Sequence, residues 1–181
     1  VLVGVGTVGG LGIFPPGNVY IAVLAGILAG MIAGLINGLI VTVLRVNPII
    51  ATLGTLAAFA GIAFLLAPEG KPIGVLTQPE FTWLARGRLG TGLPVPELGG
   101  AAWTGIPVLT VILVIVAIIF HILMAYTDFG RAIYAIGGNE TAARLAGINL
   151  TRVRIHMYML SGGVAGLAGV LLTARTTSGN P

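Results

Sequence analysis

IPVLTVILVIVAIIFHILMAY, residues 106–126, contains no Asp, Glu, Lys or Arg. A helix needs about 20 consecutive apolar residues to cross the ~30 Å hydrocarbon core of a bilayer. This stretch therefore predicts a transmembrane helix, because a helix satisfies all its backbone hydrogen bonds within one segment in lipid. A β-barrel would instead need alternating strands of roughly ten residues, and the sequence shows no such strands.

The whole chain shares this apolar character. Of its 181 residues, 56% are hydrophobic and 8% are charged, whereas a soluble domain is typically about a quarter charged. A soluble protein of this composition would expose large apolar patches, so we expect a membrane protein. The absence of cysteine excludes disulfides and thiolate metal sites. The net charge of +4 comes from scattered basic residues beside apolar runs, which indicates membrane topology and no nucleic-acid partner.

Three further runs are long enough to span a membrane. They cover residues 19–44, 49–67 and 155–174. The run 1–14 is too short and begins without an initiating Met, so we expect a truncated span and a fragment of a longer protein. The predicted fold class is therefore all-α, a polytopic transmembrane helix bundle with about four full spans plus one truncated span.

The connections between these runs predict the orientation. Asn47 can cap the third run, and Pro48 suits the first position of its helix. Residues 68–105 form a long loop with five prolines, in which PEFTWLARGRL at 79–89 is predicted to form a short interfacial helix. Basic residues are denser in the turn before Pro48 and in the passage 127–154. The positive-inside rule therefore places these two segments in the cytoplasm and residues 68–105 outside.

Small residues recur at helical spacing in two spans. Residues four apart lie on one helix face, and a face of glycines allows another helix to approach closely. We predict helix packing at Gly26, Gly30, Gly34 and Gly38 in one span, and at Gly162, Gly166 and Gly169 in the other.

Uncharged polar residues within the spans allow two interpretations. Asn37 lies in one span, and Thr52, Thr55 and Phe59 lie in the next. Such a stripe can line a translocation path for a neutral, hydroxyl-rich solute. Alternatively, the threonine hydroxyls bond to their own helix backbone.

The motifs and charges that other functional classes require are missing from this sequence. No predicted span has a carboxylate, Lys or Arg near its middle, which argues against an ion-coupled secondary transporter. No GxxxxGK[ST], GxSxG or HExxH motif is present, so we expect no ATP hydrolysis, no catalytic residues and no enzyme activity in this chain. His121 and His156 lie near span ends without further ligands, and we predict no metal site.

GGNETAARLAGINLTRVR, residues 137–154, is a polar, basic passage between two apolar runs. Asn139 is a suitable N-cap, Glu140 suits the first turn, and Gly147 suits a left-handed C-cap. The sequence therefore predicts a helix of about two turns, too short to be stable unless it packs on something. An ordinary connector on the membrane surface is the alternative interpretation.

Three segments carry a family resemblance. Residues 129–175 closely resemble the ribose-type branch of the permeases of ABC importers, and GLINGLIVTVLRVNPIIATLGT and FTWLARGRLG are similar to it as well. That family has a cytoplasmic coupling loop with a loose E-A-A-x3-G motif, which here reads T-A-A-x3-G from Thr141 to Gly147. Family members are considerably longer, so we expect no transport by the 181 residues alone.

The resemblance implies one permease domain over 1–181, with 127–154 as its coupling loop and no cofactor of its own. Its partners would be a separate cytoplasmic ATPase that holds ATP and Mg, an external sugar-binding protein, a second permease copy (identical or not) and membrane lipid. The location would be a bacterial or archaeal cytoplasmic membrane. The residues implied to dock the ATPase are Glu140, Ala142, Ala143, Arg144, Leu145 and Gly147.

The solute stays open at this point. The resemblance to the ribose-type branch implies a monosaccharide such as ribose. The spans add a small preference, because they offer neutral polar groups and no partner for a charged zwitterion. Branched-chain amino acids, nucleosides or a signalling sugar are alternatives within the family. A secondary transporter or a membrane enzyme is the alternative outside it.

Overall fold

The computed structural model describes residues 19–66, 83–84, 86–89 and 105–176. The predicted truncated span and most of the loop 68–105 lie outside this described part. The helices of the described part are α2 (Val19–Thr42), α3 (Pro48–Leu66), α5 (Val108–Tyr126), α6 (Asp128–Gly138), α7 (Glu140–Leu145) and α8 (Leu150–Thr176). Its two strands are β1 (Arg88–Leu89) and β2 (Ile106–Pro107).

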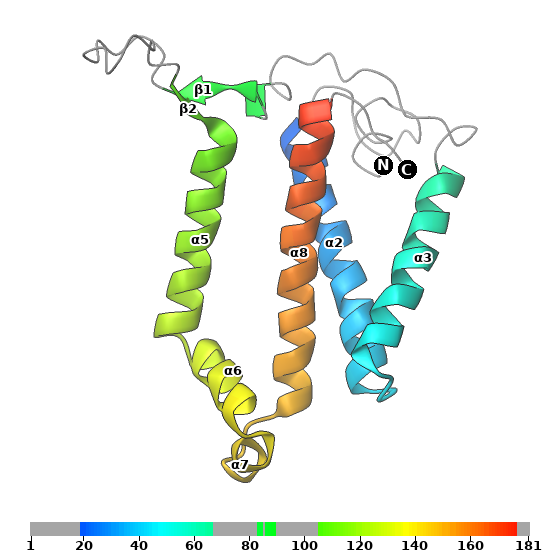
Figure 1. Ribbon diagram of the computed structural model, residues 1–181, viewed down its shortest axis with the longest axis vertical. Coiled ribbons are helices and arrows are strands. Elements are labelled where there is room, and N and C mark those ends of the chain that lie inside the picture. Colours follow the sequence, from blue (N-terminus) through cyan, green and yellow to red (C-terminus); the bar gives the residue numbers. More distant parts are fainter. Residues whose placement is uncertain (1–18, 67–82, 85, 90–104, 177–181) are drawn as a thin grey trace.

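Four helices, α2, α3, α5 and α8, are long and apolar enough to cross a membrane. The predicted all-α polytopic fold is therefore confirmed. Many of their large apolar side chains are exposed in the isolated chain, as expected for surfaces that face lipid or other helices. Figure 1 shows the four helices roughly upright, with α6 and α7 gathered at one end of the bundle.

α2 and α8 form the main helix contact in the described structure, and they lie side by side in Figure 1. Glycines meet at the crossing. A Cβ added to Gly30 would come within 2.9 Å of the Gly166 Cα, and one added to Gly34 within 2.9 Å of the Tyr158 carbonyl carbon. The two backbones can approach this closely only because side chains are missing there.

The other predicted glycines differ in their surroundings. Gly26, Gly38 and Gly162 also lie at the α2–α8 contact. Gly169 has nothing within 4 Å of an added Cβ, so it does not belong to this contact.

The turn from α2 to α3 follows its local sequence signals. The Ile49 amide donates to the Asn47 side-chain oxygen at 3.0 Å, and Pro48 is the first residue of α3, as predicted. Arg45 adopts a left-handed conformation, with φ of 56°. Further along, the Thr55 hydroxyl donates to the Asn37 side-chain oxygen at 2.6 Å and links the two helices.

Helix α6 was missed in the sequence. Thr127 caps it by accepting from the Gly130 amide at 3.3 Å. Gly130 is buried at the corner, where an added Cβ would come within 2.6 Å of the Met124 Cα. A glycine at this position therefore lets the chain turn sharply from α5 into α6. Gly137 and Gly138 are the last two residues of this helix.

Two further boundaries differ from expectation. α8 begins at Leu150, five residues earlier than predicted, because the Asn149 side chain caps it by accepting from the Arg152 amide at 3.1 Å. β1 pairs antiparallel with β2, joining Arg88 to Pro107. The predicted interfacial helix at 79–89 is described only in part: Trp83, Leu84 and Arg86 are helical, and the segment ends in β1.

Candidate functional site

α7 is a six-residue helix whose two ends are fixed by its sequence. At its start, the Ala142 amide donates to the Asn139 side-chain oxygen at 3.0 Å. At its end, the Gly147 amide donates to the Arg144 carbonyl and the Ile148 amide to the Ala143 carbonyl. Gly147 has φ of +83°, so this ending is a Schellman motif. The caps predicted at Asn139 and Gly147 are therefore confirmed.

Ala143 faces the inner side of α7. Its exposed fraction is 3%, so it packs α7 onto the rest of the chain. The sequence did not predict this burial, because a six-residue helix has no apolar periodicity that would identify its inner face. A docking role for Ala143 stays a prediction.

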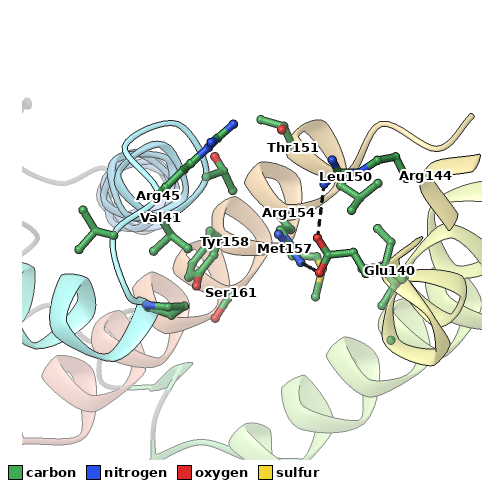
Figure 2. A pocket seen from close by; sticks show the side chains of 16 residues that line it. Val41, Arg45, Glu140, Arg144, Leu150, Thr151, Arg154, Met157, Tyr158 and Ser161 are labelled. Atoms are coloured by element: carbon green, nitrogen blue, oxygen red, sulfur yellow. Dashed lines mark hydrogen bonds and ion pairs between the residues drawn. The ribbon is translucent and has the colours of Figure 1, made fainter. Parts of the chain in front are cut away.

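Glu140 points toward α8 and is ion-paired. Its carboxylate lies 2.6 Å from an Arg154 guanidinium nitrogen and 3.7 Å from one of Arg144; Figure 2 shows both contacts. The Arg154 pair joins α7 to α8, whereas the Arg144 pair lies within α7. The role of Arg154 was missed, because a contact between residues 14 apart follows no local spacing rule.

The outward side of α7 is made of the remaining predicted docking residues. Ala142, Arg144 and Gly147 are exposed, and so is Thr141, which was not among the predicted docking residues. Leu145 is 85% exposed. A short helix with rigid ends and one projecting apolar side chain is a shape that another protein can grip.

A cavity of about 980 Å³ lies beside α7 (Figure 2). One face of α8 forms its middle, the end of α2 and the turn to α3 form one side, and α6 and α7 form the other. The charged side chains that line it are Arg45, Glu140, Arg144 and Arg154. Arg45 and Thr151 also lie in this lining, and neither was singled out in the sequence.

The residues predicted to line a translocation path are brought together only in part. The Thr52 hydroxyl donates to the Pro48 carbonyl at 2.8 Å, within its own helix. Thr55 binds Asn37 across the helix pair. Phe59 lies on α3, half-buried. A path through these residues stays a prediction.

The two histidines lie apart, and each contacts residues of its own surroundings. His156 has its Nδ1 2.6 Å from the Arg152 carbonyl and a T-shaped contact with Phe129. His121 makes a T-shaped contact with Tyr126. Across the described ranges, no group of three or more His, Cys, Asp or Glu side chains could hold a metal ion.

Comparison with known proteins agrees with the family resemblance. The family model described as branched-chain amino acid transport system / permease component matches residues 1–181. The L-arabinose transport system permease protein AraH of Escherichia coli strain K12 is 40% identical over 164 residues, which are 91% of this chain and 45% of that protein. The ribose import permease protein RbsC of Bacillus subtilis strain 168 is 38% identical over 142 residues, 78% of this chain and 40% of that protein.

A second ribose import permease protein, RbsC of Escherichia coli strain K12, is 35% identical over 168 residues, 91% of this chain and 47% of that protein. The chain thus spans less than half the length of these three relatives. No solved structure matches it. The matched family model covers the full chain, and the chain therefore belongs to the branched-chain amino acid transport system permease component family.

Proposed function

We propose that this chain forms the membrane-spanning core of a permease subunit. The permease would belong to an ATP-driven, binding-protein-dependent importer of a monosaccharide such as L-arabinose or ribose. The observation that carries the proposal is its similarity, over 91% of the chain, to permeases named for L-arabinose and ribose. α2, α3 and α5 contain no Asp, Glu, Lys or Arg, which suits an uncharged solute.

In this proposal α7 is the coupling helix and docks a separate cytoplasmic ATPase that binds ATP and Mg. Leu145 and the exposed side chains of Ala142 and Arg144 form the contact surface. An ATPase can move a distant gate only through a contact that differs between its two states. The rigid caps of α7 support this role, because a frayed helix would absorb the motion.

The remaining partners follow from the same proposal. A second permease copy completes the pathway, and an external sugar-binding protein delivers the solute to the opposite face. The end of the bundle with α7 faces the cytoplasm of a bacterial cell, as the density of arginines in 127–154 indicates.

The test is uptake by the full-length protein in liposomes with its ATPase and binding protein. We expect ATP-dependent uptake of radiolabelled L-arabinose or D-ribose, and none without ATP. Uptake driven by a proton or sodium gradient alone would contradict the proposal and favour a secondary transporter.

An amino-acid importer is the second candidate, because the matched family model is described by branched-chain amino acid transport. A zwitterion needs charged or strongly polar partners on its path. The same liposomes distinguish the two: excess unlabelled L-leucine should leave sugar uptake unchanged. Uptake of labelled L-leucine without uptake of either sugar would replace the first candidate with the second.

A further inference from the structure

The cavity beside α7 is rich in positive charge. Three arginines and one glutamate line it, which leaves two positive charges in excess. Arg144 and Arg154 share Glu140, whereas Arg45 has no hydrogen-bond or ion-pair partner among the described residues. Among the described residues, the cavity therefore offers one guanidinium without a partner and two others that a single carboxylate neutralises only in part.

Hydroxyl groups add further donors. Thr151, Tyr158 and Ser161 line the same cavity from one face of α8, and Figure 2 labels all three. None of the three hydroxyls has a hydrogen-bond partner within the part of the chain that the structure describes. Guanidinium and hydroxyl donors together are the groups that recognise a phosphate ester.

An apolar groove of about 490 Å³ between α5, α6 and α8 lies next to the cavity. Ile133, Met157 and Ser161 line both spaces. Beyond them the groove is lined by apolar side chains such as Phe120 and Val164. A cationic space and an apolar space are thus adjacent along the same face of α8.

The length of this site matches one phospholipid. Along α8, the charged end of the lining is at Arg154 and the far end of the groove is at Ala168, about 21 Å apart at about 1.5 Å per residue. One leaflet with its headgroups is about half of the ~40–45 Å bilayer. A headgroup at Arg154 and at Arg45, in the turn after α2, would therefore leave the groove at acyl-chain depth.

We propose that this cavity and groove bind one anionic phospholipid of the leaflet on the α7 side, with its phosphate at Arg45 and Arg154 and an acyl chain between α5 and α8. Basic pockets between transmembrane helices are suited to such headgroups. A bound lipid would fill the space between α5 and α8 and tie the α2 end of the bundle to α7. This site does not depend on which solute the protein carries.

The test uses the full-length protein in detergent and native mass spectrometry with added phosphatidylglycerol or phosphatidylethanolamine. We expect one phosphatidylglycerol per protomer to be retained in preference to phosphatidylethanolamine. Arg45→Gln should lower phosphatidylglycerol affinity about fivefold, the size expected from about 1 kcal/mol per basic contact. Arg45→Lys, which keeps the charge, should retain most of the binding.

Arg152→Gln is the matched control, because Arg152 lies on the same helix as Arg154 but does not line the cavity. It should bind phosphatidylglycerol as the unaltered protein does. An equal loss in Arg152→Gln and Arg45→Gln would mean non-specific attraction to the basic surface and would overturn the proposal. Retention of phosphatidylethanolamine as strong as that of phosphatidylglycerol would overturn it as well.

Two measurements on the unaltered protein need no variant. Phosphatidylglycerol with a photoreactive acyl chain should crosslink to peptides with Phe120 or Val164, which line the groove. Crosslinks spread evenly over the exposed sides of α3 would contradict the site. A complete lack of crosslinks in the groove would contradict it too, since another segment of the full protein would then fill the groove. Displacement of the lipid by millimolar inorganic phosphate would indicate a site for a soluble phosphate, and the lipid assignment would fall.

Discussion

At the scale of single residues, the absence of side chains sets the distance between α2 and α8. Gly34 faces the backbone of α8 at Tyr158, and Gly30 faces Gly166. Without a hydrophobic driving force between helices in lipid, such close packing supplies much of the association energy. Even the single methyl group of an alanine at these positions would therefore force the two helices apart.

Gly34→Ala should destabilise the full-length protein. The new Cβ would come within 3.1 Å of the Met159 Cα and still closer to the Tyr158 carbonyl, and backbone atoms cannot rotate away. Overpacking of this kind typically costs about 1–3 kcal/mol. Gly169→Ala is the matched control, with open space around the new methyl group. Equal stability of the two variants in thermal unfolding in detergent would show that the contact is not tight.

Several residues were predictable because their signals are local. Asn47, Asn139 and Gly147 each fix a helix end within a few residues, and each occupies the expected position. The inward side of α7 was not predictable in this way. The burial of Ala143 and the contact between Glu140 and Arg154 depend on where α8 lies.

At the scale of elements, α7 is held by its caps, by a buried alanine and by one ion pair to α8. These three contacts contribute separately to the stability of α7, so a single substitution can remove one and leave the others. α6 was not predicted, because its two glycines at 137 and 138 were taken as an interruption of the chain. They sit in the last turn, where glycine costs the helix little.

Gly147→Pro should abolish ATP-dependent uptake while membrane insertion persists. Proline fixes φ near about −65°, whereas Gly147 has φ of +83° and donates its amide to the Arg144 carbonyl. Gly147→Asn is the matched variant, since asparagine tolerates the left-handed conformation, and it should keep most of the uptake. Full uptake by the proline variant would contradict the role of α7.

Arg154→Gln should loosen α7 without unfolding the bundle. The pair with Glu140 is about half exposed and worth at most about 1 kcal/mol, which corresponds to roughly fivefold faster amide exchange in α7. Asp128→Asn removes an ion pair with Arg131 inside α6 and should leave α7 exchange unchanged. Hydrogen exchange with mass spectrometry measures both, and unchanged exchange in Arg154→Gln would show that the pair does not fasten α7.

At the scale of the whole molecule, α7 is joined to α8, and α8 to α2 by the glycine contact. A displacement of α7 is therefore expected to move α8, and α2 with it. α5 reaches the same end of the bundle through α6 (Figure 1). This arrangement places one exposed short helix where a partner can act on two spans.

The spans themselves were predictable, because length and apolar composition suffice to identify them. Which spans pair was not. The glycine spacing marked a close-packed face on α2 and on α8, but no sequence rule stated that the two faces meet. The cavity was unpredictable for the same reason, since its lining comes from five elements.

The proposed importer requires that the exposed side of α7 docks an ATPase. Affinity purification of the tagged full-length protein from native membranes tests this contact, compared with Leu145→Glu and the conservative control Leu145→Met. We expect a P-loop ATPase to copurify with the unaltered protein and with Leu145→Met, and to be lost with Leu145→Glu. Copurification of the ATPase with all three would contradict the docking surface, and its absence from all three would contradict the importer function itself.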